Sequence, residues 1–230
     1  MTDADALLAV LQFADGLFPS GGFAHSFGLE TYAQSGMVRD AAGLAAFVHA
    51  HLEGSAGPAD AVAVARAVGA GRAGDADACL EIDRRLDAMK AVPEFRAASR
   101  QMGRQTARAA AAATGESFLK NLAAAVEDER MPGHHAVVFG AVTGSSGASA
   151  ETAAAAFLYS TAALLVGAGL RLLPIGQIEG QQVLAAIRPR IARLAARAAA
   201  AGVDDMWSFT PGLEVAGLRH VALEGRLFRS

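Results

Sequence analysis

The stretch "AAAAFLYSTAALLVGAGL", residues 153–170, decides between two very different folds for this chain. It runs for eighteen residues without a formal charge, which is the lower edge of the length that spans a membrane. However, it is rich in alanine and glycine, it contains Tyr159, Ser160 and Thr161, and Arg171 follows immediately. We therefore predict a buried central helix whose small residues let neighbouring helices approach closely. A membrane-embedded helical protein built around this stretch is the alternative.

Helix signals recur on both sides of this stretch. Asp40 and Asp75 each precede an apolar periodic run and are suited to N-capping, and Pro93 is suited to the first turn of a long helix. Alternating runs rich in β-branched residues are missing, so a sheet is not expected. The sequence predicts an all-α fold, a single-domain bundle of roughly ten helices followed by an irregular C-terminal tail.

Glycine and proline mark the predicted breaks between these helices. Residues 22–35 read as one helix that Gly36 ends, and the helix that follows Asp40 is expected to end at Gly54. Pro58 is expected to begin the next helix, and Pro189 to kink or divide a later one.

Composition excludes several classes of function. The formal net charge of −3 argues against an electrostatic footprint for nucleic acid or anionic lipid. The single cysteine, Cys79, provides neither a disulfide framework nor a thiolate pair for zinc. The first five residues, MTDAD, are acidic where a signal peptide is basic, so a cytoplasmic protein without a membrane partner is expected.

Two kinds of ligand site find little support. The glycines and serines of residues 140–147 lack the lysine of a phosphate-binding loop and lie in a helical context. His49 and His51 are two residues apart and the adjacent pair His134 and His135 also diverges, so no metal-ligand spacing exists. A composite metal site, assembled in three dimensions or across two copies, stays open as an alternative.

The segment "FPSGGFAHSFGLE", residues 18–30, invites a catalytic reading. Asp15, Ser20 and His25 are the residue types of a hydrolytic triad, which makes a small helical hydrolase using Ser20 and His25 the alternative function. The Gly-x-Ser-x-Gly nucleophile elbow and the strand before it are both missing.

The same segment also reads as a shaped entrance to a helix. The Ser20 hydroxyl can accept a hydrogen bond from an unpaired backbone N–H, and Gly21 and Gly22 permit positive φ or close approach. On a continuous helix His25, Leu29 and Tyr32 would share one face.

Two arginine-rich segments each have two readings. Arg96, Arg100, Arg104 and Arg108 form one helical stripe, either a solvated face paired with Glu94 and other acids or a partner-binding face. Near the C-terminus, Arg226 to Arg229 enclose Leu227 and Phe228, and these residues are either interface anchors or a frayed end.

Several blocks of the chain, in order, resemble the UreF family of urease accessory proteins. They are "LLAVLQFADGLFPSGGFAHSFGLETYAQSGMVRD" (7–40), "EFRAASRQMGRQ" (94–105), "HHAVVFGAVTG" (134–144), "LRLLPIGQIEGQQVL" (170–184) and "RLFRS" (226–230). The resemblance implies an all-helical protein that dimerises and is not an enzyme. It would join the accessory protein UreD (also called UreH) and recruit the GTPase UreG, so that nickel reaches the urease apoprotein. Nickel and GTP would be handled by these partners, with no cofactor bound directly.

The resemblance also divides the chain and assigns partner-binding residues. Residues 1–205 would form the helical UreF-like domain, and residues 206–230 a tail that orders on partner binding. The residues implied in partner binding are Gly21, Gly22, Phe23, His25, Ser26, Glu30, Arg226, Leu227, Phe228 and Arg229. Phe23 corresponds to the aromatic residue after the family's pair of small residues, and Arg226 to its tail arginine.

The tail departs from the family pattern at two positions. Val221 follows His220 where the family often has glutamate, and Glu224 stands where a tyrosine is expected. The polar contacts of the tail are therefore expected to differ from the family's.

Overall fold

The computed structural model describes residues 2–230, and every regular element within them is a helix, which confirms the predicted all-α fold. The α-helices are α1 (Asp3–Ala14), α2 (Leu29–Gln34), α3 (Ala41–His51), α4 (Val62–Ala73), α5 (Ala76–Met89), α6 (Pro93–Thr114), α7 (Ser117–Glu127), α8 (His135–Ser145), α9 (Ala150–Leu172), α10 (Gln177–Ala200) and α11 (Pro211–His220). The π-helical η2 (Leu52–Ala61) and the 3₁₀ turns η1 (Gly22–Ala24) and η3 (Val203–Asp205) complete the set.

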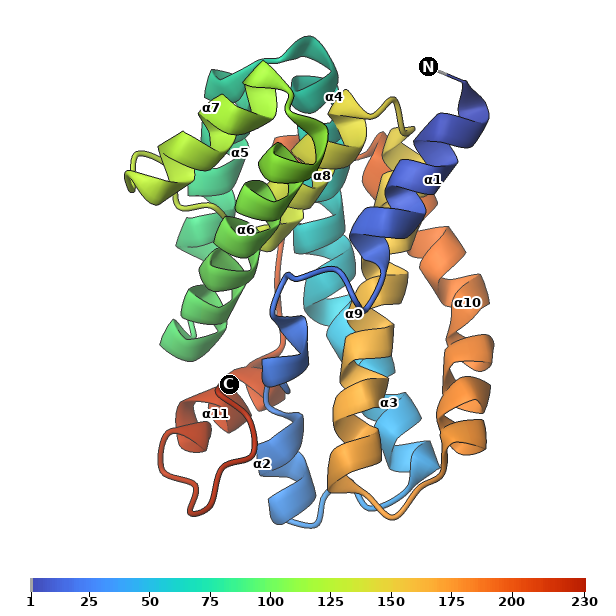
Figure 1. Ribbon diagram of the computed structural model, residues 1–230. Helices are drawn as coiled ribbons and strands as arrows, with labels where there is room; N and C mark the ends of the chain where they lie inside the picture. The colour runs from blue at the N-terminus through green and yellow to red at the C-terminus, as the bar shows by residue number, and fades with distance from the viewer. Residues whose placement is uncertain (1) are drawn as a thin grey trace.

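Helix α9 runs through the middle of the molecule and packs against α10, α4 and η2 (Figure 1). Among the residues described, it is the one helix whose length and mean hydropathy of 1.7 would suffice to cross a membrane. Half of its most apolar window is buried inside the protein. This agrees with the prediction of a central helix over 153–170.

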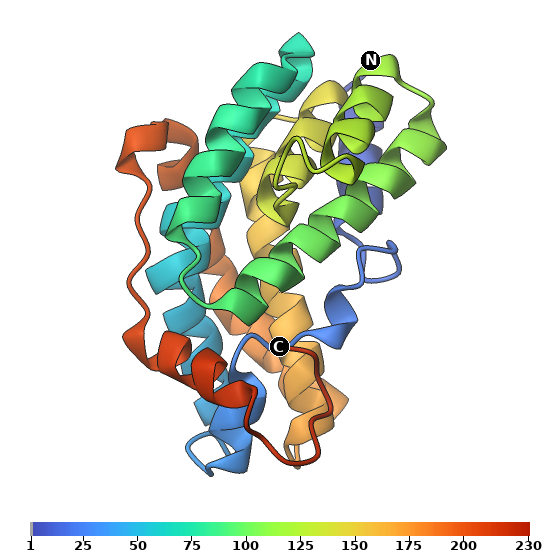
Figure 2. The same cartoon turned by 90° about the vertical axis from the view of Figure 1, so that its left-hand side faces the viewer.

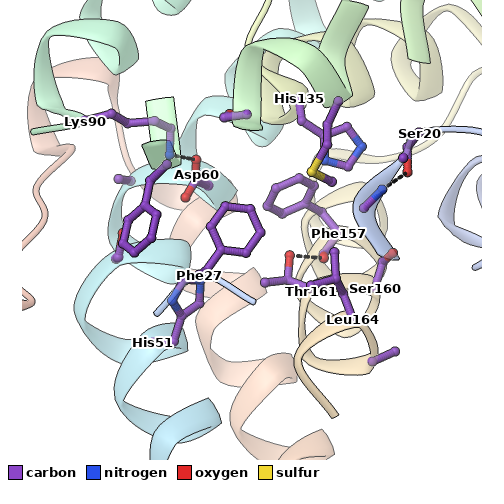
Figure 3. A pocket seen from close by; sticks show the side chains of 18 of the residues that line it. Ser20, Phe27, His51, Asp60, Lys90, His135, Phe157, Ser160, Thr161 and Leu164 are labelled. Atoms are coloured by element: carbon purple, nitrogen blue, oxygen red, sulfur yellow. Dashed lines mark hydrogen bonds and ion pairs between the residues drawn. The ribbon is translucent and has the colours of Figure 1, made fainter. Parts of the chain in front are cut away.

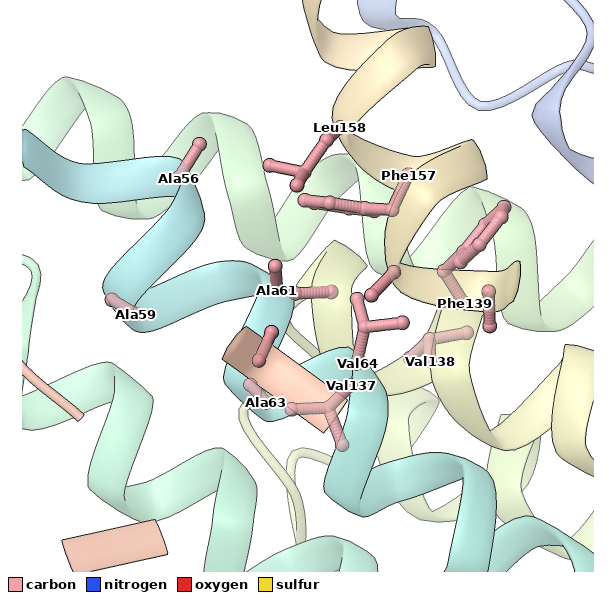
Figure 4. Packing of buried hydrophobic residues seen from close by; sticks show 14 of the residues in the cluster. Ala56, Ala59, Ala61, Ala63, Val64, Val137, Val138, Phe139, Phe157 and Leu158 are labelled. Carbon is pink, nitrogen blue, oxygen red and sulfur yellow. The ribbon is translucent and has the colours of Figure 1, made fainter. Parts of the chain in front are cut away.

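The core around α9 combines small side chains with a few large rings. Figure 4 shows Ala61 and Val64 opposite Phe139 of α8 and Phe157 of α9. Leu158, also on α9, has no exposed surface. Because alanine adds little volume, helices rich in it approach one another closely and the aromatic rings fill what remains.

Helices α4 and α8 approach each other closely. A Cβ atom at Gly140 would lie 2.4 Å from the carbonyl oxygen of Val64, and one at Gly144 would lie 2.2 Å from that of Val68. Glycine is therefore required at both positions for steric reasons. The glycine cluster of residues 140–147 thus serves mainly the packing of two helices.

The predicted helix starts are confirmed. The Asp40 carboxylate accepts the N–H of Gly43 at 2.8 Å, and the Asp75 carboxylate accepts that of Ala78 at 2.9 Å. Pro93 is the first residue of α6, where its missing N–H costs nothing.

The predicted breaks at Gly54 and Pro58 are wrong, because both residues lie inside η2, which joins α3 to α4 without interruption. Gly54 and Pro58 instead offer their carbonyl oxygens to the extended segment before α11. The N–H of Phe209 reaches Gly54 at 2.8 Å and the N–H of Trp207 reaches Pro58 at 3.3 Å. A Cβ atom at Gly54 would lie 2.9 Å from the Phe209 carbonyl oxygen, so this glycine permits a close contact. Pro189 lies within α10 and does not divide it, whereas a kink at this residue stays a prediction.

Candidate partner-binding site

Residues 20–30, the signature segment, are held close to the body by their glycines. Gly21 has φ +80°, and a Cβ atom there would lie 2.5 Å from a side-chain oxygen of Gln105. A Cβ atom at Gly22 would lie 2.7 Å from Leu164. The Ser20 hydroxyl accepts the N–H of Gly22 at 3.4 Å, a long bond that agrees with its predicted role at a helix entrance.

The predicted helix over residues 22–35 is wrong, because the chain turns sharply between η1 and α2. Phe27 has φ +49° and Gly28 has φ +90°, both in the left-handed region that stops a right-handed helix. His25 consequently does not share a helix face with Leu29 and Tyr32. It points inward and is buried.

The C-terminal part of the chain returns to this turn. Helix α11 packs against α2, with the Thr31 hydroxyl bonded to the Ala216 carbonyl at 3.0 Å. Beyond α11 the chain loops back so that its end lies beside the signature segment (Figures 1 and 2). The structure therefore adds a helix, Pro211–His220, inside the segment expected to be irregular.

Glu30 is the centre of the contact between the signature segment and the tail, and it is 1% exposed. One of its carboxylate oxygens accepts the N–H of Leu227 at 2.6 Å. The other accepts the N–H of Phe228 at 3.1 Å and lies 2.9 Å from Nε2 of His220. One buried carboxylate thus receives three hydrogen-bond donors from the C-terminal region.

His220 joins this carboxylate to a second one. Its Nδ1 lies 2.7 Å from a carboxylate oxygen of Glu94, whose other oxygen accepts Arg226 Nη1 at 2.9 Å. Both ring nitrogens of His220 therefore face a carboxylate oxygen at hydrogen-bonding distance. The two carboxylates are thus joined through one imidazole, and Arg226 adds a cation on the side of Glu94.

The last residues make a second set of contacts. The main-chain oxygen of Ser230 accepts the N–H groups of Ser26 and Phe27 at 2.6 and 3.1 Å, and the Ser26 hydroxyl at 2.9 Å. The Arg229 N–H reaches the Ala24 carbonyl at 2.9 Å. Backbone and side-chain groups of the signature segment therefore also fasten the last two residues of the tail.

The pairing that the hydrolase alternative requires does not form within residues 2–230. His25 Nδ1 lies 2.9 Å from the Ser230 hydroxyl, whereas the Ser20 hydroxyl is bonded to Gly22. Burial, and then the charge of Arg229, lowers the pKa of His25 to about 4. A base of this kind, buried and turned away from Ser20, cannot activate that hydroxyl.

The predicted partner-binding residues fall into two groups in the structure. His25, Ser26, Glu30 and Phe228 are buried and hold the tail in place. A second group faces solvent: Phe23 is 75% exposed, Leu227 is 58% exposed and the Arg226 side chain is 38% exposed.

Arg171, Glu94 and His220 complete the site, and their roles were missed at the sequence level. The Arg171 guanidinium donates to the Phe23 carbonyl at 2.7 Å and lies 4.1 Å from the centre of the Phe228 ring. Arg171 therefore holds the main chain of the exposed Phe23 and stacks against the ring of the buried Phe228. Glu94 had been expected to pair with the arginine stripe, and the structure pairs it with Arg226.

The arginine stripe on α6 is mostly paired with other acids. Arg100 donates to Asp87 at 2.6 Å, and Arg96 donates to the Lys90 carbonyl at 2.9 Å. Arg104 lies 4.0 Å from Glu129. These contacts agree with the reading of this stripe as a solvated face.

The histidines show no metal-ligand arrangement in the part of the chain described. No three His, Cys, Asp or Glu side chains come together there as a possible ligand group. His134 is instead bonded to Ser99 at 3.0 Å and to Asp87 at 2.8 Å.

Burial lowers the pKa of His135 to about 4, which gives a testable effect of pH on stability. An unfolded histidine titrates near 6.5, so between these values the unfolded state binds a proton that the folded state does not. Stability is therefore lost as the pH falls below about 6.5. In urea unfolding at pH 7, 6 and 5, His135→Phe should flatten this decline by up to about 1.4 kcal/mol per pH unit. Parallel curves for the two proteins would contradict the assignment.

Fold and site together define an all-helical protein whose C-terminal tail is fastened to its own signature segment. The model of the UreF family matches residues 38–188. Proteins named urease accessory protein UreF align along nearly their whole length. That of Trichodesmium erythraeum (strain IMS101) is 32% identical, covering 99% of this chain and 98% of its own. That of Rhizobium leguminosarum bv. viciae is 37% identical, with 99% and 98% covered. The chain belongs to the UreF family of urease accessory proteins.

Proposed function

We propose that the protein is a non-catalytic adaptor in urease maturation. It joins UreD/UreH, recruits the GTPase UreG, and so couples GTP hydrolysis to the delivery of nickel into urease. It works in the cytoplasm as a homodimer within this complex, and the partners bind the nickel and the GTP.

One observation carries the proposal: hydrogen bonds join the signature segment to the end of the tail, and each of the two exposes side chains suited to an interface. Phe23 is exposed on the first, and Arg226 and Leu227 are exposed on the second. Aromatic and arginine side chains are the usual anchors of protein interfaces. A partner that docks there would contact both segments at once.

The tail carries a second set of exposed apolar side chains. Trp207 is 52% exposed, Phe209 74%, Leu218 59% and Val221 63%. Exposed apolar groups of this size suit a protein partner that covers them. We assign these side chains to contact with UreD/UreH and the surface around Phe23 to contact with UreG.

Coupling to hydrolysis then requires only differential binding. If the surface around Phe23 contacts one nucleotide state of the GTPase better than the other, binding shifts the equilibrium towards that state.

Recruitment of UreG by the co-expressed complex with UreD tests this assignment. Phe23→Ala and Arg226→Ala should each weaken capture of UreG by roughly tenfold or more, the effect of losing an interface anchor. Ile178, 76% exposed on α10, and Arg84, exposed on α5, provide matched controls. Ile178→Ala and Arg84→Ala should leave capture unchanged. If the Phe23 and Arg226 variants capture UreG as well as these controls do, the docking surface lies elsewhere.

A further inference from the structure

A cavity of about 550 Å³ lies directly beneath the signature segment. Its walls are mainly apolar and come from several helices, with Phe27, Met89, Phe95, Met102, Phe157 and Leu164 among the lining residues. Figure 3 shows Phe27 and Phe157 within it. The volume falls in the range of about 300–1,000 Å³ that is usual for small-molecule sites.

The loop between α1 and η1 forms one wall of this cavity. Residues 14–23 all line it, and between α1 and Gly21 they are turns and bends rather than helix. Gly22 lets the loop come close to Leu164 and Met102, since a Cβ atom there would lie 2.7 and 3.1 Å from them. The same loop exposes Leu17 and Phe23 to solvent.

Two imidazoles give the cavity polar groups that the protein leaves unused. Burial lowers the pKa of His51 and of His135 to about 4, so both rings are neutral at pH 7. No hydrogen bond to either ring is found within residues 2–230. A neutral imidazole has one donor and one acceptor, and each ring can therefore bind a hydroxyl or amide group.

The charged groups of the lining favour an uncharged ligand. Lys90 and Asp60 form an ion pair at 2.7 Å, with only 16% and 12% of their side chains exposed, so each charge is already compensated. The other two charged residues of the lining, Asp15 and Glu214, are acidic and would repel an anion. An organic cation would have to break this buried pair to reach Asp60.

We propose that this cavity binds an uncharged amphipathic small molecule. Its aromatic or aliphatic body lies against Phe27, Phe157 and Leu164, and its hydroxyl or amide group bonds to His51 or His135. Because no third ligand joins these imidazoles within residues 2–230, the site is organic rather than metallic. Occupancy would support the loop that carries Phe23 from beneath.

Titration of the full-length protein with N-phenyl-1-naphthylamine, an uncharged fluorescent probe, tests whether the cavity binds an apolar ligand. We expect saturable binding at one site per chain. Ser160→Phe and Ala163→Phe, which place a ring into the cavity from α9, should each weaken binding by about tenfold or more. Ile178→Phe adds the same ring to an exposed position of α10 and should have no effect.

Circular dichroism and thermal unfolding identify any variant that fails to fold, and two cavity variants guard against that failure. Non-saturable binding to the unsubstituted protein, or equal binding by the folded cavity variants, would overturn the proposal.

Displacement of the probe by 2-naphthol or by naphthalene tests whether an imidazole binds the polar group of the ligand. His51→Phe or His135→Phe keeps an apolar ring but removes the hydrogen-bonding nitrogens. At least one of the two substitutions should weaken the binding of 2-naphthol by roughly 2- to 10-fold, which is the contribution of one hydrogen bond. The binding of naphthalene should not change. If neither variant separates the two competitors, the imidazoles do not recognise a polar group and the ligand class is wrong. None of these measurements uses a urease partner, so their outcome is independent of the adaptor role.

Discussion

Alanine in place of Gly71 should destabilise the protein, whereas alanine in place of Gly69, two residues earlier on the same helix, should stabilise it. A Cβ atom at Gly71 would lie 2.1 Å from the carbonyl oxygen of Ala141 on α8. No atom lies within 4 Å of a Cβ at Gly69, which is exposed. The contact at Gly71 is with backbone, so α4 and α8 must separate to accept the methyl group.

Both substitutions gain the same helix propensity, about 1 kcal/mol in favour of alanine. Overpacking at Gly71 costs about 1–3 kcal/mol and outweighs that gain if the helices cannot yield. The two variants should therefore differ in free energy of unfolding by about 1–3 kcal/mol, with Gly69→Ala the more stable. Urea unfolding followed by circular dichroism measures this difference. Equal midpoints for the two variants would show that α4 and α8 are less tightly packed than the structure indicates.

Local signals predicted the helices better than the contacts between them. Asp40, Asp75 and Pro93 act through neighbours in the sequence, so their patterns were sufficient to place helix starts. Gly54 and Pro58 were misread as breaks because their surroundings are set by a segment about 150 residues away, the one that carries Trp207 and Phe209. A glycine that ends a helix and a glycine that admits another backbone look alike in one sequence.

The long-range contacts of the site could not be predicted from the sequence either. The resemblance to the UreF family pointed to the signature segment and the tail separately, and both contain residues of the site. Nothing in the sequence pairs Glu30 with His220, which is 190 residues away, or Glu94 with Arg226. The burial of Glu30 was equally hidden, since an isolated glutamate in a helical pattern is most often exposed.

Replacement of Glu30 by alanine should release the tail while leaving the helical body folded. The variant would leave the N–H groups of Leu227 and Phe228 without an acceptor and His220 facing only Glu94. Each unsatisfied buried donor costs about 1–3 kcal/mol, and more when it is charged. The contacts that remain after α11 are those of Arg226 with Glu94, of Phe228 with Arg171, and of the last two residues with residues 24–27. Their loss would expose less of the protein than opening the helical body would, so detachment of the tail is the expected response.

Trypsin cleavage after Arg226, followed by mass spectrometry, should then be at least about tenfold faster than in the unsubstituted protein, because each 1.4 kcal/mol of lost protection is worth a factor of ten. The amides of Leu227 and Phe228 should also lose their protection from hydrogen exchange. Glu30→Gln keeps one carbonyl acceptor and should have a smaller effect. Glu81→Ala removes an exposed glutamate of α5 and should have none.

The same variant connects the geometry of the site to the adaptor role. Glu30 holds the N–H groups of Leu227 and Phe228, so Glu30→Ala should release Arg226 and Leu227 from their places and reduce capture of UreG, although Glu30 itself is buried. A tail that stays protected in Glu30→Ala would show that the Ser230 contacts and the Phe228–Arg171 contact hold it without the carboxylate. A released tail with normal capture of UreG would instead show that the partner itself places these residues.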